Sequence, residues 1–279
     1  MTSEKMLTPF ETVVSRDGTT IAYEAYGTGP AAIIVGGAFC DRGSFRELAE
    51  ALAERSFTAV TYDRRGRGDS TDTPPYAVQR EVEDLQAIIG AVVGAPDSGP
   101  ASEAYLHGIS SGGALVIEAL AAGLPVARAS ALEVPYRTEA FPPAPPDYIE
   151  TLERFEQAGD REGIVRYFHT RVVGMPEEGL AHMVGTPMWD ALLAIAPTVR
   201  YDGLCLGGDD QSMPTERLAT ITTPFLAVAS SGTQAPWLHD APAALAHALP
   251  HGEHVELEGG FHDVPARTLA PVLADFYRS

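Results

Sequence analysis

Short apolar runs alternate along this chain with longer segments whose apolar residues recur every three or four positions. The short runs are typical of buried strands and the longer period is typical of helices. Strands are predicted at residues 31–36, 58–62, 103–109, 128–133, 225–230 and 254–258. Helices are predicted at residues 44–54, 80–93, 111–122, 236–248 and 266–277. This alternation predicts an α/β fold, a mainly parallel sheet with helices on both faces.

Two segments depart from that rhythm. Apolar and polar residues alternate on both sides of Asp17-Gly18, which predicts an N-terminal β-hairpin. Further along, helical patterns follow one another without a strand, at residues 147–158, 160–173, 177–184 and 187–198. A proline-rich stretch, Phe141 to Pro146, opens this part and is typical of a stiff connector. We therefore divide the chain into a core, residues 1–134 and 219–279, and a helical insertion, residues 135–218.

The stretch Gly108-Ile109-Ser110-Ser111-Gly112 lies where a predicted strand runs into a predicted helix. A Gly-x-Ser-x-Gly spacing in this context indicates a sharp turn that holds the serine at its apex in a strained backbone conformation. The helix that follows directs its free amides and the positive end of its dipole toward the same place. Ser110 is therefore the candidate nucleophile, and Ser111 is the alternative, although a motif centred there lacks its first glycine.

Three further segments give the chain a resemblance to the α/β-hydrolase family over nearly its whole length. They are Gly36-Gly37-Ala38 after a strand, the turn from Asp63 to Ser70, and Gly259-Gly260-Phe261-His262-Asp263 near the C-terminus. The resemblance implies an α/β-hydrolase fold with the helical insertion as a lid after the sixth strand. A small second domain without a role at the site is the alternative for that insertion.

The resemblance also assigns roles to residues of this chain. His262 follows the last strand and is the expected base for Ser110, because a serine needs such a base to attack at neutral pH. The oxyanion hole is expected to combine the amide of Ser111 with that of Ala38, or alternatively of Phe39. Family members usually have His-Gly where this chain has Gly36-Gly37, so a histidine is missing from the turn.

The third member of the triad is a departure from the family pattern. The usual aspartate follows the seventh strand, but the loop from Ser230 to Pro236 contains no carboxylate. Asp240 comes later, within the next predicted helix, where it is expected to point away. Glu133 ends the sixth strand, where some family members carry their acid, and a carboxylate there would be costly without a partner. We therefore expect Glu133, and not Asp240, to pair with His262.

Composition and charge argue against several classes of partner and of reaction. The 279 residues carry a net charge of −19, which argues against nucleic acid and anionic membranes as partners and favours a small-molecule substrate. Lys5 is the only lysine and lies near the N-terminus, which disfavours Schiff-base chemistry. The two cysteines, Cys40 and Cys205, form no disulfide framework. We expect a cytoplasmic protein without a metal or a cofactor, and the oligomeric state is left open.

Together these features predict a serine hydrolase that cleaves a small-molecule ester or lactone through an acyl-enzyme on Ser110. Two alternatives stay open. The missing acid and the altered Gly36-Gly37 turn also fit a lyase or cyclase that reuses the same cavity, and a catalytically silent binding protein is the third possibility.

Overall fold

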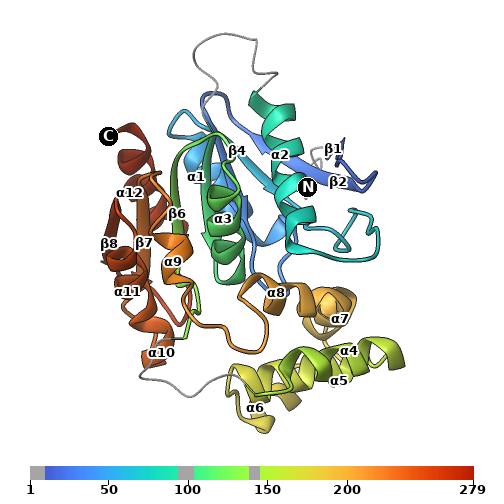
Figure 1. Ribbon diagram of the computed structural model, residues 1–279. Helices are drawn as coiled ribbons and strands as arrows, with labels where there is room; N and C mark the ends of the chain where they lie inside the picture. Colours follow the sequence, from blue (N-terminus) through green and yellow to red (C-terminus); the bar gives the residue numbers. More distant parts are fainter. Residues whose placement is uncertain (1–9, 94–103, 138–144) are drawn as a thin grey trace, which may run out of the picture.

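The computed structural model of the protein describes residues 10–93, 104–137 and 145–279. Its centre is an eight-stranded sheet in the order β1-β2-β4-β3-β5-β6-β7-β8 (Figure 1). The strands are β1 (Glu11–Val14), β2 (Thr20–Tyr26), β3 (Ala31–Val35), β4 (Thr58–Tyr62), β5 (Ala104–Ile109), β6 (Val126–Leu132), β7 (Phe225–Ser230) and β8 (Gly252–Leu257). Strand β2 pairs antiparallel with β1 and with β4, and every later neighbour is parallel. The predicted hairpin and mainly parallel sheet are confirmed.

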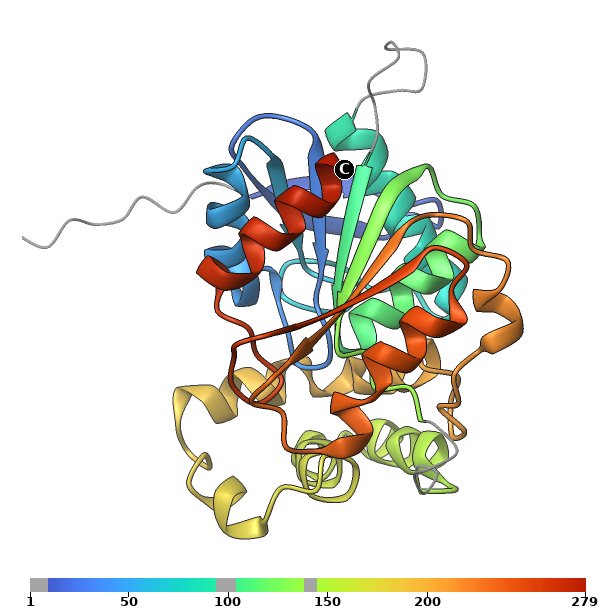
Figure 2. The same ribbon diagram turned by 90° about the vertical axis from the view of Figure 1, so that its left-hand side faces the viewer.

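Helices cover both faces of this sheet because successive residues of a buried strand point to opposite sides. On β3, Ile33 and Val35 belong to one apolar cluster, and Ala32 and Ile34 belong to another. The first cluster is completed by α2 (Val78–Val93), α3 (Ser111–Ala121) and α11 (Ala241–Ala248), and the second by α1 (Arg46–Ala53) and α12 (Ala266–Arg278). Figure 2 shows α1 in blue and α12 in red together on one side of the sheet.

Several predicted helices are interrupted where proline or local geometry intervenes. The helix expected at 236–248 is two helices, α10 (Pro236–His239) and α11, because Pro242 in the first turn of α11 cannot donate a helical hydrogen bond. The helix expected at 44–54 begins as the 3₁₀ turn η1 (Arg42–Phe45). The helix expected at 160–173 is α5 (Arg161–Tyr167), which continues as the π-helix η2 (Phe168–Val172).

Most of the helical insertion, described from residue 145, packs on the end of the core that lies lowest in Figures 1 and 2, whereas its last helix lies beside α3. Besides α5 and η2 it contains α4 (Tyr148–Ala158), α6 (Glu177–Ala181), α7 (Pro187–Ile195), η3 (Ala196–Thr198), α8 (Val199–Cys205) and α9 (Thr215–Leu218). Helices α8 and α9 were not predicted, because they are short and lack a repeating apolar pattern. Residues 141–144 of the expected connector lie outside the described residues, as does Lys5.

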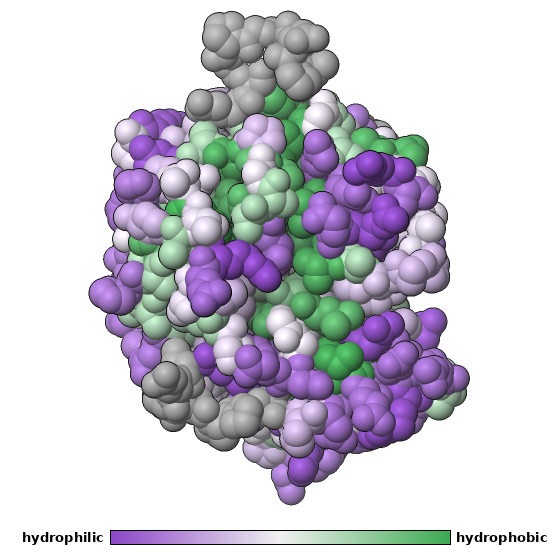
Figure 3. Space-filling view, viewed as in Figure 1, coloured by the Kyte–Doolittle hydropathy of each residue, from purple (hydrophilic) through white to green (hydrophobic). Residues whose placement is uncertain are grey.

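The insertion has an apolar core of its own, which includes Tyr148, Leu152, Trp189 and Val199. Phe39, from the core of the protein, also packs against it. The outer side of the insertion in Figure 3 is mostly hydrophilic, as expected for helices that bury one face only. None of the helices in the described ranges is both long enough and apolar enough to cross a membrane.

The register of the parallel strands brings four of their carboxyl ends to one edge. Val35 pairs with Gly108, Ile109 with Leu132, and Leu132 with Val228. The residues that follow β3, β5, β6 and β7 therefore emerge side by side. Ligand sites of open α/β sheets form at this edge, since loops from several strands converge there.

Candidate active site

Ser110 occupies a sharp turn between β5 and α3. Its backbone has φ 57° and ψ −128°, a conformation that residues other than glycine rarely adopt. The flanking positions require glycine because the neighbouring backbone leaves no room for a side chain. A Cβ at Gly112 would lie 2.1 Å from the carbonyl oxygen of Val35. A Cβ at Gly108 would lie 2.3 Å from the Cα of Gly113. The turn therefore has the geometry that the Gly-x-Ser-x-Gly spacing predicted, with Ser110 partly exposed at its apex.

Backbone strain is concentrated around this turn. Within the described residues, the non-glycine residues with positive φ are Phe39, Ser56, Ser110, Glu133, Gln211 and His262. Ser110 and His262 line one cavity, together with Gln211, and Glu133 is bonded to His262. Such conformations are retained only where the surrounding structure enforces them, and they are common at active sites.

Glu133 and His262 form a hydrogen-bonded pair, with 2.8 Å between His262 Nδ1 and Glu133 Oε2. The Glu133 side chain is fully buried, whereas the His262 side chain is 24% exposed. The second carboxylate oxygen of Glu133 accepts a hydrogen bond of 2.8 Å from the backbone amide of Ser230. Because Nδ1 is hydrogen-bonded to the Glu133 carboxylate, Nε2 is the ring nitrogen of His262 that remains available for proton transfer.

The loop after β7 supports this pair although it carries no acid. Thr233 donates its hydroxyl to Glu133 at 3.0 Å and accepts the backbone amide of His262 at 2.9 Å. Ser230 donates its hydroxyl to the carbonyl oxygens of Gly260 and Asp263, on either side of His262. The loop in which the family has its aspartate therefore orients the histidine loop. We did not predict this role for Thr233; a hydroxyl residue in a loop that lacks the usual carboxylate is the signal that would have indicated it.

Asp240 lies elsewhere. It lies between α10 and α11, so it is not inside one continuous helix as predicted, and its side chain makes no capping hydrogen bond to α11. Its side chain is 62% exposed and is bonded to His239 at 3.0 Å. The structure therefore brings Glu133, and not Asp240, to His262.

Ser111, the alternative nucleophile, and His107, the histidine that precedes the Gly-x-Ser-x-Gly turn, have partners of their own. The hydroxyl of Ser111 is buried and donates to Asp202 Oδ1 at 2.7 Å. His107 is buried within β5, where its Nδ1 lies 2.8 Å from the hydroxyl of Ser130. Neither arrangement is that of a nucleophile or base at the cavity.

Burial lowers the pKa of His107 to about 3, well below its ordinary value of 6.5. Between these values the unfolded chain binds a proton at this residue and the folded protein does not, so stability is lost as the pH falls from 6.5 toward 3. The slope from one such group is at most about 1.4 kcal/mol per pH unit. We expect His107→Gln to flatten the pH dependence of the unfolding free energy in this range, measured by urea unfolding. An unchanged slope would show that His107 is not a source of the acid sensitivity.

The turn after β3 is where the second donor of the oxyanion hole was expected. Gly37 and Ala38 line the cavity beside Ser110 and Ser111. Phe39 has φ 58°, and its ring contacts the rings of Phe168 and His169 of the helical insertion at 5.3 and 5.0 Å between centroids. The backbone after β3 and the start of α3 therefore border the same space, as a pair of oxyanion donors requires.

The cavity has a volume of about 360 Å³. Its apolar wall is formed by Phe45, Ile109, Pro135, Tyr148, Phe168, Val172, Val173, Leu206, Trp237, Leu238 and Phe261. Arg137 and Gln211 are polar members of the wall. The wall thus combines residues of the core with residues of the insertion, including two from the π-helix, a feature common at functional sites.

The arginine-rich turn after β4 does not face outward as an anion site. Arg64 and Arg65 are buried and form ion pairs with Glu81 and Asp84. Asp63 is buried as well and accepts the backbone amides of Arg42 and Asp69. The turn is therefore structural. Among the residues that the structure describes, no cluster of histidine, cysteine and carboxylate side chains could hold a metal ion.

A family model and several known proteins are similar to this chain. The family model described as "Alpha/beta hydrolase family" matches residues 32–272. The chain belongs to the alpha/beta hydrolase family. An alpha/beta hydrolase from Sphaerobacter thermophilus is 43% identical, with a TM-score of 0.86 over 96% of this chain and 100% of that chain. The predicted family, fold and enzyme class are confirmed.

Two other similar proteins are more distant or match over less of the chain. The uncharacterized hydrolase YraK of Bacillus subtilis is 31% identical over 104 residues, which is 36% of this chain and 35% of that protein. An esterase from Thermogutta terrifontis is 20% identical and has a TM-score of 0.68, with 97% of each chain covered. This last likeness concerns the fold.

Proposed function

We propose that this alpha/beta hydrolase cleaves a small-molecule carboxylic ester or lactone through an acyl-enzyme on Ser110. The observation that carries the proposal is the buried carboxylate of Glu133 on Nδ1 of His262, in the loop that borders the same cavity as Ser110. In serine hydrolases an acid placed in this way orients the histidine that takes the proton of the nucleophilic serine. The esterase activity named for the Thermogutta protein is consistent with this class of substrate.

In the first half of the reaction, Ser110 Oγ attacks the ester carbonyl carbon while His262 Nε2 takes its proton. The carbonyl oxygen becomes an oxyanion and accepts hydrogen bonds from the amides of Ser111 and Ala38. The tetrahedral intermediate then collapses. The bond to the alcohol oxygen breaks, His262 returns the proton to that oxygen, and the acyl group stays on Ser110.

In the second half, a water molecule attacks the acyl carbon while His262 removes one of its protons. The bond to Ser110 Oγ breaks, the serine regains a proton from His262, and the carboxylic acid leaves. Throughout, the carboxylate of Glu133 stabilises the imidazolium that forms when His262 is protonated. Burial of Glu133 makes its charge more effective, since water does not screen it.

We further propose that the helical insertion acts as the lid of the site. Its support is the share of the cavity wall that residues 145–218 provide: Tyr148, Phe168, Val172, Val173, Asp202, Leu206 and Gln211. A lid excludes water from the reacting groups and shapes substrate choice. The apolar wall and the volume of about 360 Å³ favour compact substrates with largely apolar acyl and alcohol groups.

A panel of aryl and alkyl esters and small lactones tests the function. We expect turnover with equal amounts of free acid and alcohol, or of the hydroxy acid from a lactone. We also expect an intact-protein mass raised by one acyl group when the reaction is quenched early. Elimination or cyclised products without an acyl-enzyme would favour the lyase or cyclase alternative. Absence of both turnover and acylation would favour the binding protein.

A further inference from the structure

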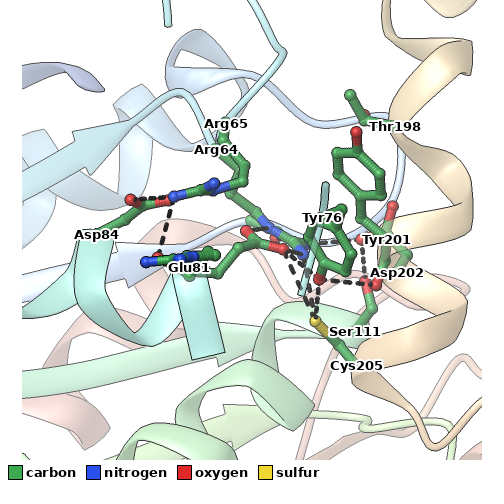
Figure 4. Close-up of polar contacts among 12 residues, drawn as sticks. Arg64, Arg65, Tyr76, Glu81, Asp84, Ser111, Thr198, Tyr201, Asp202 and Cys205 are labelled. Atoms are coloured by element: carbon green, nitrogen blue, oxygen red, sulfur yellow. Dashed lines mark hydrogen bonds and ion pairs between the residues drawn. The ribbon is translucent and has the colours of Figure 1, made fainter. Parts of the chain in front are cut away.

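Helix α8 of the insertion places one carboxylate at the centre of a buried polar network. This carboxylate belongs to Asp202, which is 2% exposed and contacts the core of the protein through both of its oxygens (Figure 4). Its Oδ1 accepts the hydroxyl of Ser111 at 2.7 Å and Nη1 of Arg64 at 2.5 Å. Its Oδ2 accepts Nη2 of Arg67 at 2.7 Å. Asp202 of the insertion is thus hydrogen-bonded directly to Ser111, the residue that follows Ser110.

The two arginines continue the network to the other side of the expected oxyanion hole. Arg67 Nη1 donates to the carbonyl oxygens of Gly37 at 2.6 Å and Cys40 at 3.2 Å. Arg64 Nη1 donates to the carbonyl oxygen of Gly36 at 3.3 Å. These carbonyls flank Ala38 and Phe39, the candidates for the second donor. Arginine side chains therefore hold this turn, in which the family's usual histidine is missing.

The positive and negative charges of the network are equal in number, and each charged group has hydrogen-bond partners. Arg64 and Arg67 face two carboxylates, Asp202 and Glu81, and Glu81 binds Arg64 through both oxygens at 2.6 and 2.7 Å. Burial raises the pKa of Asp202, but Arg67 and Arg64 lower it by more, so its pKa lies below its ordinary value. Removing the Asp202 charge would leave Arg67 without that partner in a buried place, where a lost carboxylate is costly.

We propose that Asp202 is a positioning residue for the oxyanion hole, which it links to the helical insertion. It would hold the Ser111 amide through the Ser111 hydroxyl, and the turn of Ala38 through Arg67 and Arg64. This inference rests on the proposed function. Donor amides must lie about 3 Å from the oxyanion, so a small displacement of either one weakens transition-state binding more than substrate binding.

Asp202→Asn tests the proposal, with Asp84→Asn as the matched control. The asparagine side chain would keep an oxygen acceptor but lose the charge and direct an amide donor at a guanidinium. Asp84 is equally buried and pairs with Arg65 of the same turn at 2.7 and 2.8 Å, on the side away from Ser111 (Figure 4). Both variants remove one buried charge from one arginine-rich turn, so a general loss of stability affects both.

For Asp202→Asn we expect a kcat lowered by about 10- to 100-fold on esters, less than the 10²–10³ that follows removal of a whole donor. KM should stay within about twofold of the wild-type value, since ground-state binding does not use these amides. The affinity for phenylboronic acid, which forms a tetrahedral adduct with an active-site serine, should fall in parallel with kcat. Asp84→Asn should leave kcat and boronic acid affinity close to those of the wild type.

The outcomes separate this inference from the proposed function. A wild-type protein that neither hydrolyses esters nor binds phenylboronic acid would overturn both. An active wild type in which Asp202→Asn and Asp84→Asn have equal effects, or in which Asp202→Asn raises KM alone, would overturn the inference only. If Asp202→Asn does not fold, Ser111→Ala decides, because it keeps the amide and every ion pair. A several-fold lower kcat with unchanged KM supports the link, and an unchanged kcat overturns it.

Discussion

Ser110→Ala is expected to lower ester turnover by a factor on the order of 10⁶, the loss seen when a serine protease loses its nucleophile. Without Oγ no acyl-enzyme forms, and only binding and the oxyanion donors remain. The fold should be unaffected, because Ser110 is partly exposed in the cavity and alanine meets the same backbone strain. Initial rates with the best ester of the panel give the loss, and thermal unfolding checks the fold.

Labelling with a fluorophosphonate identifies the nucleophile independently of the substrate. We expect one label per chain, on Ser110 after digestion and mass spectrometry, and no label on the Ser110→Ala variant. Ser111→Ala should still be labelled, because the Ser111 hydroxyl is buried and bonded to Asp202. A label on Ser111, or none on the wild type, would contradict the assignment of Ser110.

Glu133→Gln is expected to lower kcat by about 10⁴, the effect of the equivalent change in a serine protease. A neutral amide would not stabilise the imidazolium of His262, and it could hold the ring in the wrong tautomer. Asp240→Asn is the control, since its carboxylate is exposed and bonded to His239. It should leave kcat within about twofold of the wild-type value.

Glu133 also accepts hydrogen bonds from Ser230 and Thr233, so Glu133→Gln is expected to lower stability as well. The activities of Glu133→Gln and Asp240→Asn should therefore be compared at an equal fraction of folded protein. Reaction with the fluorophosphonate gives a second measure, since it depends on the same base. Slow labelling of Glu133→Gln alongside normal labelling of Asp240→Asn is the expected pattern. The opposite pattern would return the role of the acid to Asp240.

Local sequence was sufficient to predict features that depend on near neighbours. Strands β3 and β7, for example, were found because each contains five consecutive apolar residues, a pattern typical of a buried strand. The turn at Ser110 was found because only glycine fits at 108 and 112, where backbone atoms lie within 2.3 Å of the place that a Cβ would occupy. By contrast, the break between α10 and α11 and the π-helix from Phe168 depended on local geometry that the apolar pattern does not report.

The sequence by itself determined the strand–turn–helix at Ser110, the histidine after the last strand and the absence of a carboxylate after β7. Only the tertiary structure decided that Glu133 contacts His262, since 129 residues separate them and their distance depends on strand order and register. The same holds for Asp202, which stands in a short helix with no distinguishing motif. Its contact with Ser111 spans 91 residues and arises because the helical insertion packs on the carboxyl ends of the strands.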